Sequence, residues 1–518
     1  MQLSLEDAKL TLGALLRRTA LRVPDRVAII WEQQKLTWRQ LDEQVNRVAH
    51  GLIAAGIQPG EPVGLLINKR PELVIMFLAC ARMGAIATPI NFKLTHDRIR
   101  YQFEHISMKA ALIEKEHQPI YEAVKDLMPD PQRAIFLTPP AGADVHADFN
   151  VWEKLLQHSP DDPAHQAKPE DTVYLNYTSG STGRPKGAIT SHANIIWNCL
   201  SNLATFLMYE DDVFLGMFST FSHPHELFHR AICLGCTAVL VDSLNPRIIG
   251  RAIQEHRVTW MMGVPTFYEM LFQQAEHGHL DLSSLRVLEA GGAFIDAQTL
   301  TDMESRFNTT LMPVWGSTET TGVGLALVKG PERKAGTIGK PCAFYEFRVV
   351  NDEGQDVGVD EVGEMLVKGP AVVSGYLNAP EETARLFRDG WYHTQDLVQR
   401  DADGYFKFVG RRSEMLKIGG IRVYPSEIEL AIKGHDEVHA VVVVGAYDKV
   451  RGEQARAVVV RRPGSALTEK ALRVHCRQTL AVYQMPRIIE FWEQLPQLPN
   501  GKIDKKAVSS TPLPPGHD

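Results

Sequence analysis

Helical and strand-like patterns alternate through about the first 400 residues, and this alternation restricts the fold more than any other feature of the sequence. Between residues 36 and 52, apolar residues recur three or four positions apart, as on one face of a helix. Short apolar runs at 62–67, 238–241 and 260–264 each follow a helical pattern and predict buried strands. This order predicts an α/β fold with largely parallel sheets.

The pattern changes after about residue 345. Short strands are predicted at 347–350, 364–368 and 405–409, and turns rich in Asp and Gly lie between them. We therefore expect a smaller β subdomain at about 345–410.

A compact βα pattern follows residue 410. It predicts a helix that begins near residue 427 and a buried strand at 440–444. The expected organisation is a large N-terminal domain over 1–410, made of parallel βα subdomains and the β subdomain, and a small α+β C-terminal domain over 411–518.

Composition excludes several classes of protein. The 518 residues are 44% hydrophobic and 23% charged, which is typical of a globular protein and not of a disordered scaffold. The formal net charge is −7, so a nucleic-acid partner is not expected, because such proteins normally carry a basic surface.

Neither a signal peptide nor a transmembrane segment is expected. Glu6 and Asp7 stand where a signal peptide needs positive charge, and the apolar run at 73–81 is much shorter than the ~20 residues that cross a bilayer. Six cysteines in a chain of this length do not indicate a disulfide framework, and Cys233 and Cys236 are interpreted as packed thiols. These features predict a cytoplasmic protein.

The most informative motif is the segment 177–187, which reads YTSGSTGRPKG and follows a predicted strand at 173–175. Glycines allow backbone amides to approach a phosphate, hydroxyls add donors, and Lys186 supplies a compact positive charge. A flexible surface loop is the alternative. The motif is not that of P-loop NTPases, because Pro185 precedes the lysine and Gly187 follows it where a hydroxyl is required.

This segment resembles the signature loop of the ANL adenylating enzymes, which include acyl-CoA synthetases, peptide-synthetase adenylation domains and beetle luciferases. The resemblance extends over about residues 36–506, with several motifs in the family's order. It implies a catalytic role for Lys186 and nucleotide binding by a run of loop residues: Thr178, Ser179, Gly180, Ser181, Thr182 and Gly183.

Two further motifs imply contacts with the nucleotide. Gly291, Gly292 and Ala293 resemble the turn beside adenine and the acyl pocket. The motif WGSTE at 315–319 resembles the aromatic-Gly-x-Thr-Glu motif, with Trp315 in place of the usual tyrosine and Gly316 after it.

In the WGSTE motif, Thr318 is implied to lie near the α-phosphate. Glu319 is implied to bind Mg²⁺, which prefers hard oxygen ligands. Capping of a helix by Thr318 and Glu319 is the alternative.

The motif WYHTQD at 391–396 resembles Trp-x-x-Thr-Gly-Asp, so Asp396 is implied to bind the ribose hydroxyls. Gln395 stands where glycine is usual, a departure that concerns the local backbone geometry more than the role of Asp396. Arg411 is implied to contact ribose or phosphate, and Ser413 is the expected hinge of a mobile C-terminal domain.

Two C-terminal features imply a CoA acceptor and an adenylation lysine. Lys417, Gly419 and Gly420 resemble the segment along which the pantetheine arm of CoA passes, and a plain turn at the two glycines is the less favoured alternative. The segment 498–502 resembles the Pro-x-Gly-Lys motif, so Lys502 is implied to act in adenylation.

The acyl pocket is the least certain region. Relatives often have Pro-Leu-Phe-His where this chain has FSTFSHPHE at 218–226. Either His223 or His225 could line the pocket, and a solvent-facing or capping role is as plausible.

The resemblance implies an ATP-dependent acid–CoA ligase that forms acyl-AMP and pyrophosphate and then transfers the acyl group to CoA, with Mg²⁺ as cofactor. Domain alternation is expected between the two steps. The alternatives are a free-standing adenylation enzyme that loads a carrier protein, and a nucleotide-sensing protein with an inactive site. The sequence leaves open the oligomeric state and the acid, which could be fatty, branched, aromatic or small and polar.

Overall fold

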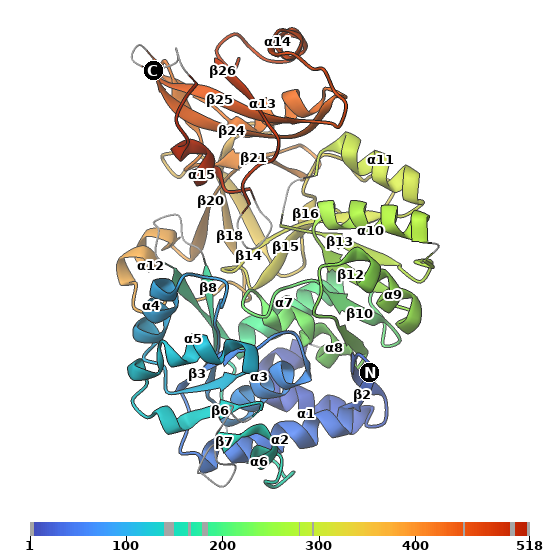
Figure 1. The fold of residues 1–518 in the computed structure, drawn as a ribbon, viewed down its shortest axis with the longest axis vertical. Helices are drawn as coiled ribbons and strands as arrows, with labels where there is room; N and C mark the ends of the chain where they lie inside the picture. Colours follow the sequence, from blue (N-terminus) through green and yellow to red (C-terminus); the bar gives the residue numbers. More distant parts are fainter. Residues whose placement is uncertain are drawn as a thin grey trace. The chain divides into compact units, whose positions relative to one another are not determined.

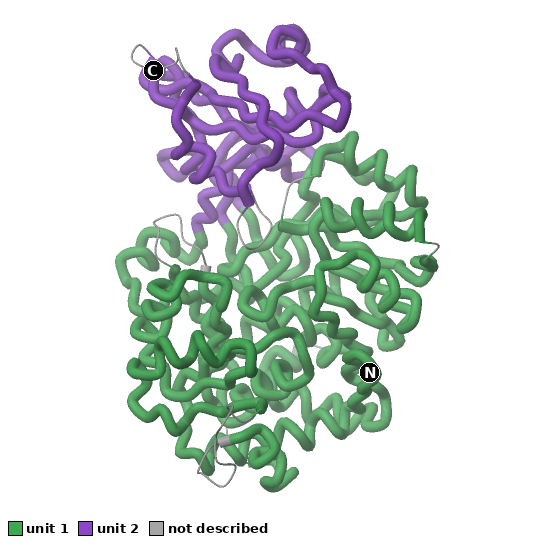
Figure 2. Tube along the Cα trace, in the orientation of Figure 1, with its two compact units in different colours: residues 1–347, 367–392 green, residues 348–366, 393–518 purple. Residues whose placement is uncertain are grey.

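The computed structural model of the chain describes residues 5–138, 150–163, 167–178, 185–278, 280–292, 295–448, 451–497 and 503–514. The chain forms two compact units (Figure 2). Unit 1 comprises residues 1–347 and 367–392, and unit 2 comprises residues 348–366 and 393–518. These units are defined by compactness, and the domain boundary expected at residue 410 stays a prediction.

Unit 1 contains a nine-stranded sheet in the order β16-β15-β14-β13-β12-β10-β11-β1-β2 (Figure 1). The pairs from β1 through β11, β10, β12 and β13 to β14 are all parallel, whereas β2, β15 and β16 pair antiparallel with their neighbours. The strands are β1 (Val27–Trp31), β2 (Gln34–Thr37), β10 (Val213–Gly216), β11 (Thr237–Leu240), β12 (Trp260–Gly263), β13 (Val287–Ala290), β14 (Leu311–Ser317), β15 (Gly322–Ala326) and β16 (Lys340–Pro341).

A seven-stranded sheet of unit 1 has the order β7-β6-β5-β3-β4-β8-β9. All its pairs are parallel except β8 with β9. The two sheets confirm the largely parallel α/β architecture. The strands are β3 (Pro62–Leu66), β4 (Ile86–Pro89), β5 (Ala110–Ile113), β6 (Ala134–Phe136), β7 (Asn150–Val151), β8 (Thr172–Thr178) and β9 (Lys186–Ser191).

Helices connect the parallel strands of unit 1, as parallel pairing requires. The α-helices are α1 (Leu12–Arg22), α2 (Trp38–Ala54), α3 (Pro71–Met83), α4 (His96–Ile106), α5 (Gln118–Glu122), α6 (Trp152–Leu155), α7 (His192–Thr205), α8 (His229–Leu234), α9 (Pro246–His256), α10 (Pro265–Gly278), α11 (Ala297–Phe307) and α12 (Pro380–Leu386). Short 3₁₀ helices are η1 (Leu5–Lys9), η2 (Lys115–His117), η3 (Lys125–Leu127), η4 (Pro131–Arg133) and η5 (Pro224–Leu227).

The helix predicted from residue 36 begins at Trp38, because residues 34–37 pair with β1 as strand β2. Thr37 ends that strand and caps the helix: its side chain accepts a hydrogen bond from the amide of Gln40, whose side chain accepts one from the amide of Thr37. One threonine therefore serves as strand end and helix cap.

A layer of helices joins the two sheets through a common apolar core. The core cluster includes residues of α1, α2, α3, α7 and α8 together with residues of both sheets. Phe77 of α3 illustrates the link, because its ring lies 5.5 Å from that of Tyr174 in β8 and 5.2 Å from that of Phe228, which precedes α8. Helix α3 is buried along residues 73–83.

The strands expected after residue 345 are observed in a five-stranded sheet whose residues are divided between the two units. The sheet order is β17-β18-β20-β19, with β21 paired to β20, and the chain passes between the units within β17, β18 and β20. The bounds are β17 (Glu346–Val350), β18 (Gly363–Lys368), β19 (Phe387–Arg388), β20 (Trp391–Arg400) and β21 (Phe406–Arg411).

The remainder of unit 2 is a five-stranded sheet in the order β23-β22-β25-β24, with β26 paired to β25. The elements are β22 (Leu416–Ile418), β23 (Ile421–Val423), α13 (Pro425–Lys433), β24 (Val438–Asp448), β25 (Gly452–Arg461), α14 (Glu469–Cys476), β26 (Ile488–Trp492) and α15 (Lys505–Ser510). The helix expected near 427 and the strand expected at 440–444 are α13 and the centre of β24.

All six cysteines are free and buried, which confirms that Cys233 and Cys236 are packed thiols. Across the described ranges, no helix has both the length and the apolar character needed to cross a membrane.

Candidate active site

Two predicted residues of unit 1, Lys186 and Glu319, converge on a tyrosine that the sequence did not single out. The hydroxyl of Tyr376 donates a hydrogen bond to Oε1 of Glu319 at 2.6 Å, and Nζ of Lys186 lies 5.7 Å from the centre of the Tyr376 ring. Lys186 opens β9 and forms an ion pair with Glu382 of α12. The sheet and the loops therefore place a cation near the face of one aromatic ring and a carboxylate at its hydroxyl.

The WGSTE motif ends β14 and forms its turn into β15. The amide of Thr321 donates to the carbonyl of Thr318 at 3.1 Å, and the amide of Ser317 donates to the hydroxyl of Thr320 at 2.9 Å. A Cβ on Gly316 would lie 2.2 Å from the carbonyl oxygen of Gly322, so no side chain fits there. The tight hairpin explains the motif's glycine and fixes where Thr318 and Glu319 stand.

Glu319 is held through its backbone and its side chain. Its carbonyl accepts from the amide of Val373 at 2.9 Å, and the residue is only 8% exposed. Burial and the Glu319 carboxylate raise the pKa of Tyr376, so the phenol stays protonated and donates to that carboxylate. Helix capping, the alternative for this motif, is not observed, because residues 318–320 form a turn between two strands.

The chemistry of Glu319 fits Mg²⁺. Within the described ranges, no group of three or more His, Cys, Asp and Glu side chains could hold a metal alone. Mg²⁺ is often held by one or two carboxylates together with substrate phosphates and water, so a single carboxylate close to a lysine that is predicted to bind phosphate is a suitable donor set.

The two candidate histidines occupy different environments. His223 is half-buried, and its Nε2 lies 3.5 Å from Oγ1 of Thr318. His225 is fully buried, and its Nε2 bonds to the carbonyl of Thr321 at 2.9 Å. Burial and neighbouring His223 lower the pKa of His225 to about 3, so it stays neutral. His223 is therefore the better placed of the two for contact with a substrate, and its role in the pocket stays a prediction.

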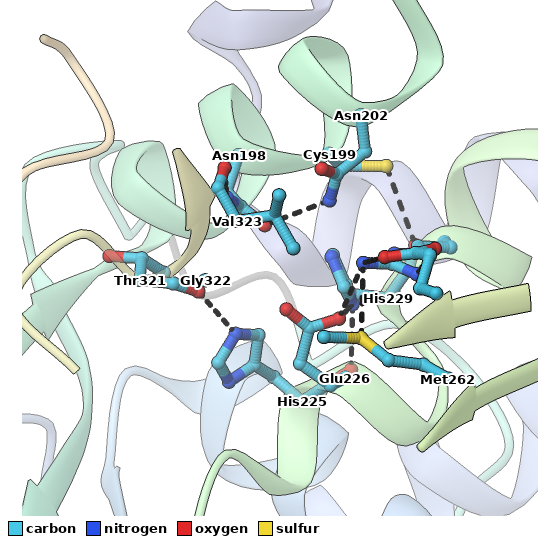
Figure 3. A network of polar contacts seen from close by, with 12 residues as sticks. Asn198, Cys199, Asn202, His225, Glu226, His229, Met262, Thr321, Gly322 and Val323 are labelled. Atoms are coloured by element: carbon cyan, nitrogen blue, oxygen red, sulfur yellow. Dashed lines mark hydrogen bonds and ion pairs between the residues drawn. The ribbon is translucent and has the colours of Figure 1, made fainter. Parts of the chain in front are cut away.

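A buried network that includes His225, Glu226 and His229 lies beside Thr321 and Gly322 (Figure 3). Arg230 of α8 donates to Oε1 of Glu289 in β13 at 2.7 Å and lies 3.1 Å from Oε2 of Glu226. Trp260 also donates to Glu289, at 2.6 Å. Burial raises the pKa of Glu226 to about 7. The network ties η5 and α8 to the centre of the nine-stranded sheet.

The residues predicted to contact adenine lie at the carboxyl ends of adjacent strands. Ala290 of β13 pairs with Pro313 of β14, so Gly291 directly follows β13 and Trp315 lies in the last part of the neighbouring β14. Gly292 has φ +79°, a conformation that favours glycine. Trp315 is half-buried, with its ring 6.0 Å from that of Phe347. Ligands of open α/β sheets bind at this edge. The adenine contacts stay predictions.

In unit 2, the structure pairs Asp396, which is predicted to bind ribose, with Arg411, which is predicted to contact ribose or phosphate. Asp396 of β20 lies opposite Arg411 of β21, and Nε of Arg411 is 3.0 Å from Oδ1 of Asp396. Asp396 is only 2% exposed, whereas the Arg411 side chain is 58% exposed. Gln395 has φ +63°, so it retains the left-handed conformation for which glycine is usual.

The predicted hinge and CoA residues lie in turns of unit 2. Gly419 and Gly420, with φ +58° and +84°, form the two-residue turn between β22 and β23. This hairpin is sufficient to explain both glycines, so their contact with CoA stays a prediction. The amide of Lys417 in β22 donates to Glu453 at 2.6 Å, and Ser413 is exposed in the turn before β22.

Several predicted residues, or their side chains, lie outside the part of the chain that the structure describes. Thr178 ends β8, but its side chain is not among those described. The others are Ser179, Gly180, Ser181, Thr182 and Gly183 of the glycine-rich loop, Ala293, and Lys502.

Sequence reasoning missed Tyr376, Glu382 and Glu364. Tyr376 and Glu382 contact Glu319 and Lys186, and Glu364 contacts the side chain of Gln395. All are contacts between segments distant in sequence, so periodicity and spacing carry no signal for them. The only local hint is Gly375, whose φ of +148° indicates an unusual backbone before Tyr376.

A cavity of about 460 Å³ in unit 1 is not lined by these residues. Lys368, Phe387, Trp391 and Tyr392 contribute to its lining, and no predicted catalytic or nucleotide-binding residue does.

Comparison with known proteins shows the family of the chain. The family model described as AMP-binding enzyme matches residues 16–377, and the model for the AMP-binding enzyme C-terminal domain matches residues 427–502. The chain belongs to the AMP-binding enzyme family. This family is the adenylate-forming group that the motifs resemble, so the chain is an adenylate-forming enzyme of the acid–CoA ligase type.

Relatives in this family align along nearly the whole chain. A feruloyl-CoA synthase from an Amycolatopsis species is 34% identical over 510 residues, covering 96% of this chain and 98% of that protein. An indoleacetate–CoA ligase from Aromatoleum aromaticum is 31% identical, covering 94% of this chain and 95% of that protein.

Among solved structures of the AMP-binding family, the anthranilate CoA ligase AuaEII in complex with anthranoyl-AMP superposes with a TM-score of 0.89 at 25% identity. The superposition covers 98% of each chain. ATP-bound MatB from Rhodopseudomonas palustris has a TM-score of 0.87 at 26% identity, covering 96% of this chain and 98% of that one. These matches confirm the expected fold class.

Proposed function

We propose that this enzyme joins an aromatic carboxylic acid to CoA in two steps, with acyl-AMP as the intermediate. The observation that carries the chemistry is the convergence of Lys186 and Glu319 on Tyr376. The aromatic acid is supported by relatives named for ferulate and indoleacetate and by a structural neighbour named for anthranilate.

In the first step, a carboxylate oxygen of the acid attacks the α-phosphorus of ATP, and the bond to pyrophosphate breaks. The barrier is electrostatic, because an anion approaches a polyanion. Lys186, Thr318 and Lys502 are the residues that would counter the growing charge. Removing one preorganised contact of this kind typically costs about 10²–10³ in rate.

Glu319 would hold Mg²⁺, which neutralises phosphate charge when bound. Tyr376 fixes one oxygen of this carboxylate and so limits its orientation. Lys186 is paired with Glu382, so the phosphates of ATP must compete with that carboxylate for the ammonium group.

In the second step, the CoA sulfur attacks the acyl carbonyl, the bond to AMP breaks, and AMP leaves. We propose that the C-terminal part turns about Ser413 between the steps, so that Lys502 serves the first and the segment of Lys417, Gly419 and Gly420 serves the second. Free buried thiols persist in a reducing compartment, and we place the enzyme in the cytoplasm.

A panel of acids tests the substrate and the acceptor together. Ferulate, indoleacetate, anthranilate, a long-chain fatty acid and oxalate are each incubated with ATP, Mg²⁺ and either CoA or a phosphopantetheinylated carrier protein. We expect AMP release and a thioester with the aromatic acids and CoA. A thioester with the carrier protein alone would contradict the proposed acceptor, and turnover of only the fatty acid would contradict the proposed substrate class.

A further inference from the structure

A buried carboxylate in unit 2 ties together the two residues that flank the predicted ribose contacts. Glu364 of β18 is 4% exposed. Its Oε1 accepts from Nε2 of Gln395 at 2.6 Å, and its Oε2 accepts from Nη1 of Arg412 at 2.8 Å. Gln395 precedes Asp396 and Arg412 follows Arg411, so one side chain anchors both strands beside the Asp396–Arg411 pair.

The backbone closes the same arrangement. The amide of Arg412 donates to the carbonyl of Gln395 at 2.8 Å, and the amide of Gln395 donates to Oε1 of Glu364 at 3.3 Å. The Thr394 hydroxyl donates to the carbonyl of Met365 at 2.8 Å and accepts from the amide of Asp396 at 3.0 Å. These hydrogen bonds fix the backbone of residues 394–396, from which the Asp396 side chain extends.

Gln395 is unusual because relatives usually have glycine at this position. A non-glycine residue with positive φ carries a conformational penalty, which glycine would avoid. Gln395 retains this conformation, and its amide group reaches a buried carboxylate. The side chain therefore makes a contact that glycine, usual at this position, could not make.

The arrangement continues toward the predicted hinge. Arg412 immediately precedes Ser413 and also pairs with Asp352, which in turn pairs with Arg422. Those two pairs are considerably more exposed than the Glu364 contacts, so solvent weakens them. The buried contacts of Glu364 therefore stabilise this segment more than the two exposed pairs do.

We propose that Glu364 and Gln395 are positioning residues that hold the Asp396 carboxylate and the Arg411 guanidinium in place for the ribose of ATP. This inference rests on the proposed function, because it assumes that Asp396 accepts hydrogen bonds from the ribose hydroxyls. The consequence is selectivity: loss of either contact should weaken the enzyme's preference for a nucleotide that carries those hydroxyls.

The test compares ATP with 2′,3′-dideoxy-ATP, which lacks the hydroxyls. For the parent and each variant, kcat/KM for acid-dependent AMP formation is measured with both nucleotides. Gln395→Gly removes the amide and relieves the backbone, so it should fold, and Glu364→Gln is the second variant. We expect each to lower the preference for ATP by about tenfold, through a higher KM for ATP, while activity with dideoxy-ATP changes little.

A matched control is Glu490→Gln. Glu490 pairs with the buried Arg456 at 2.6 Å elsewhere in unit 2, so its loss weakens the same kind of contact without touching Asp396. Its thermal stability should fall while its preference for ATP is retained. A purely structural role for Glu364 would make all three variants behave alike.

Asp396→Ala tests the ribose assignment separately from the positioning roles of Gln395 and Glu364. If it loses the preference for ATP while Gln395→Gly and Glu364→Gln retain it, the ribose assignment stands and the inference about positioning is wrong. If Asp396→Ala itself retains the preference, the ribose assignment is wrong, and the inference falls with it.

Discussion

At the scale of single residues, Tyr376 limits the orientation of the Glu319 carboxylate through a direct hydrogen bond. Tyr376→Phe keeps the ring beside Lys186 and removes the hydroxyl that donates to Glu319 at 2.6 Å. A hydrogen bond to a charged group contributes about 1.5–3 kcal/mol, so we expect adenylation to slow by roughly 10- to 100-fold. The Mg²⁺ concentration needed for half-maximal rate should also rise. Acid-dependent ATP–pyrophosphate exchange at a series of Mg²⁺ concentrations measures both.

Tyr121→Phe is the control for this variant, because the Tyr121 hydroxyl donates to the carbonyl of Pro131 at 3.0 Å, far along the chain from the motifs. It should exchange like the parent. An unchanged Mg²⁺ requirement in Tyr376→Phe would contradict the role given to Tyr376.

Glu382 is expected to restrain Lys186, the lysine proposed to bind phosphate. A hydrogen bond from Arg385, with a further contribution from Lys186, lowers the pKa of Glu382 to about 2, so the carboxylate is ionised at neutral pH and pairs with the ammonium group. Glu382→Gln should release Lys186 and lower KM for ATP about two- to fivefold at low ionic strength, with a smaller effect at high salt. Steady-state kinetics at two salt concentrations provide the measurement.

Glu381→Gln removes the same charge from the preceding, exposed position of α12. An equal fall in KM for this control would show that the effect comes from overall charge, and the specific competition with ATP would then be wrong.

At the scale of elements, much of the fold is predictable because its signals are local. Apolar runs such as 260–264 become buried parallel strands, and the apolar spacing between residues 36 and 52 becomes helix α2. The start of that helix was displaced by two residues because strand pairing with β1 overrode the helical pattern.

The candidate site is only partly predictable for a related reason. The motif residues Lys186, Thr318, Glu319 and Asp396 carry a recognisable local pattern. Their partners Tyr376, Glu382 and Glu364 do not, because each reaches its motif through tertiary packing. The tight turn at Gly316 likewise depends on Gly322 across the hairpin.

The buried network of η5, α8 and β13 predicts a pH-dependent stability. Burial raises the pKa of Glu226 from its ordinary value of 4.5 to about 7. Between these values the folded chain keeps this proton while the unfolded chain releases it, so the free energy of unfolding decreases as pH rises through the window. Glu226→Gln removes this titration and leaves Arg230 paired with Glu289.

We expect the difference in Tm between Glu226→Gln and the parent to favour the variant more at pH 8 than at pH 5. At pH 8, the free energy of unfolding of the variant should exceed that of the parent by at most about 3 kcal/mol. Thermal unfolding at the two pH values measures this. Glu255→Gln, which changes an exposed position of α9, should show no such difference. The interpretation is wrong if Glu226→Gln differs from the parent equally at both pH values.

At the scale of the whole molecule, the proposal requires the C-terminal part to serve two reactions in turn. Lys502→Ala should abolish most acyl-AMP formation, while thioester formation from supplied acyl-AMP and CoA should continue. Single-turnover assays of each half-reaction distinguish these steps. Equal losses in both would contradict domain alternation about Ser413.

The central claim is that Glu319, held by Tyr376 beside Lys186, supports formation of the acyl adenylate. The most direct measurement is acid-dependent ATP–pyrophosphate exchange by the parent and by Glu319→Gln, at a temperature where both are folded. We expect exchange by the parent with at least one aromatic acid. The exchange rate of Glu319→Gln should be lower by about 10²-fold or more. Exchange by Glu319→Gln at the parent's rate would contradict the central claim.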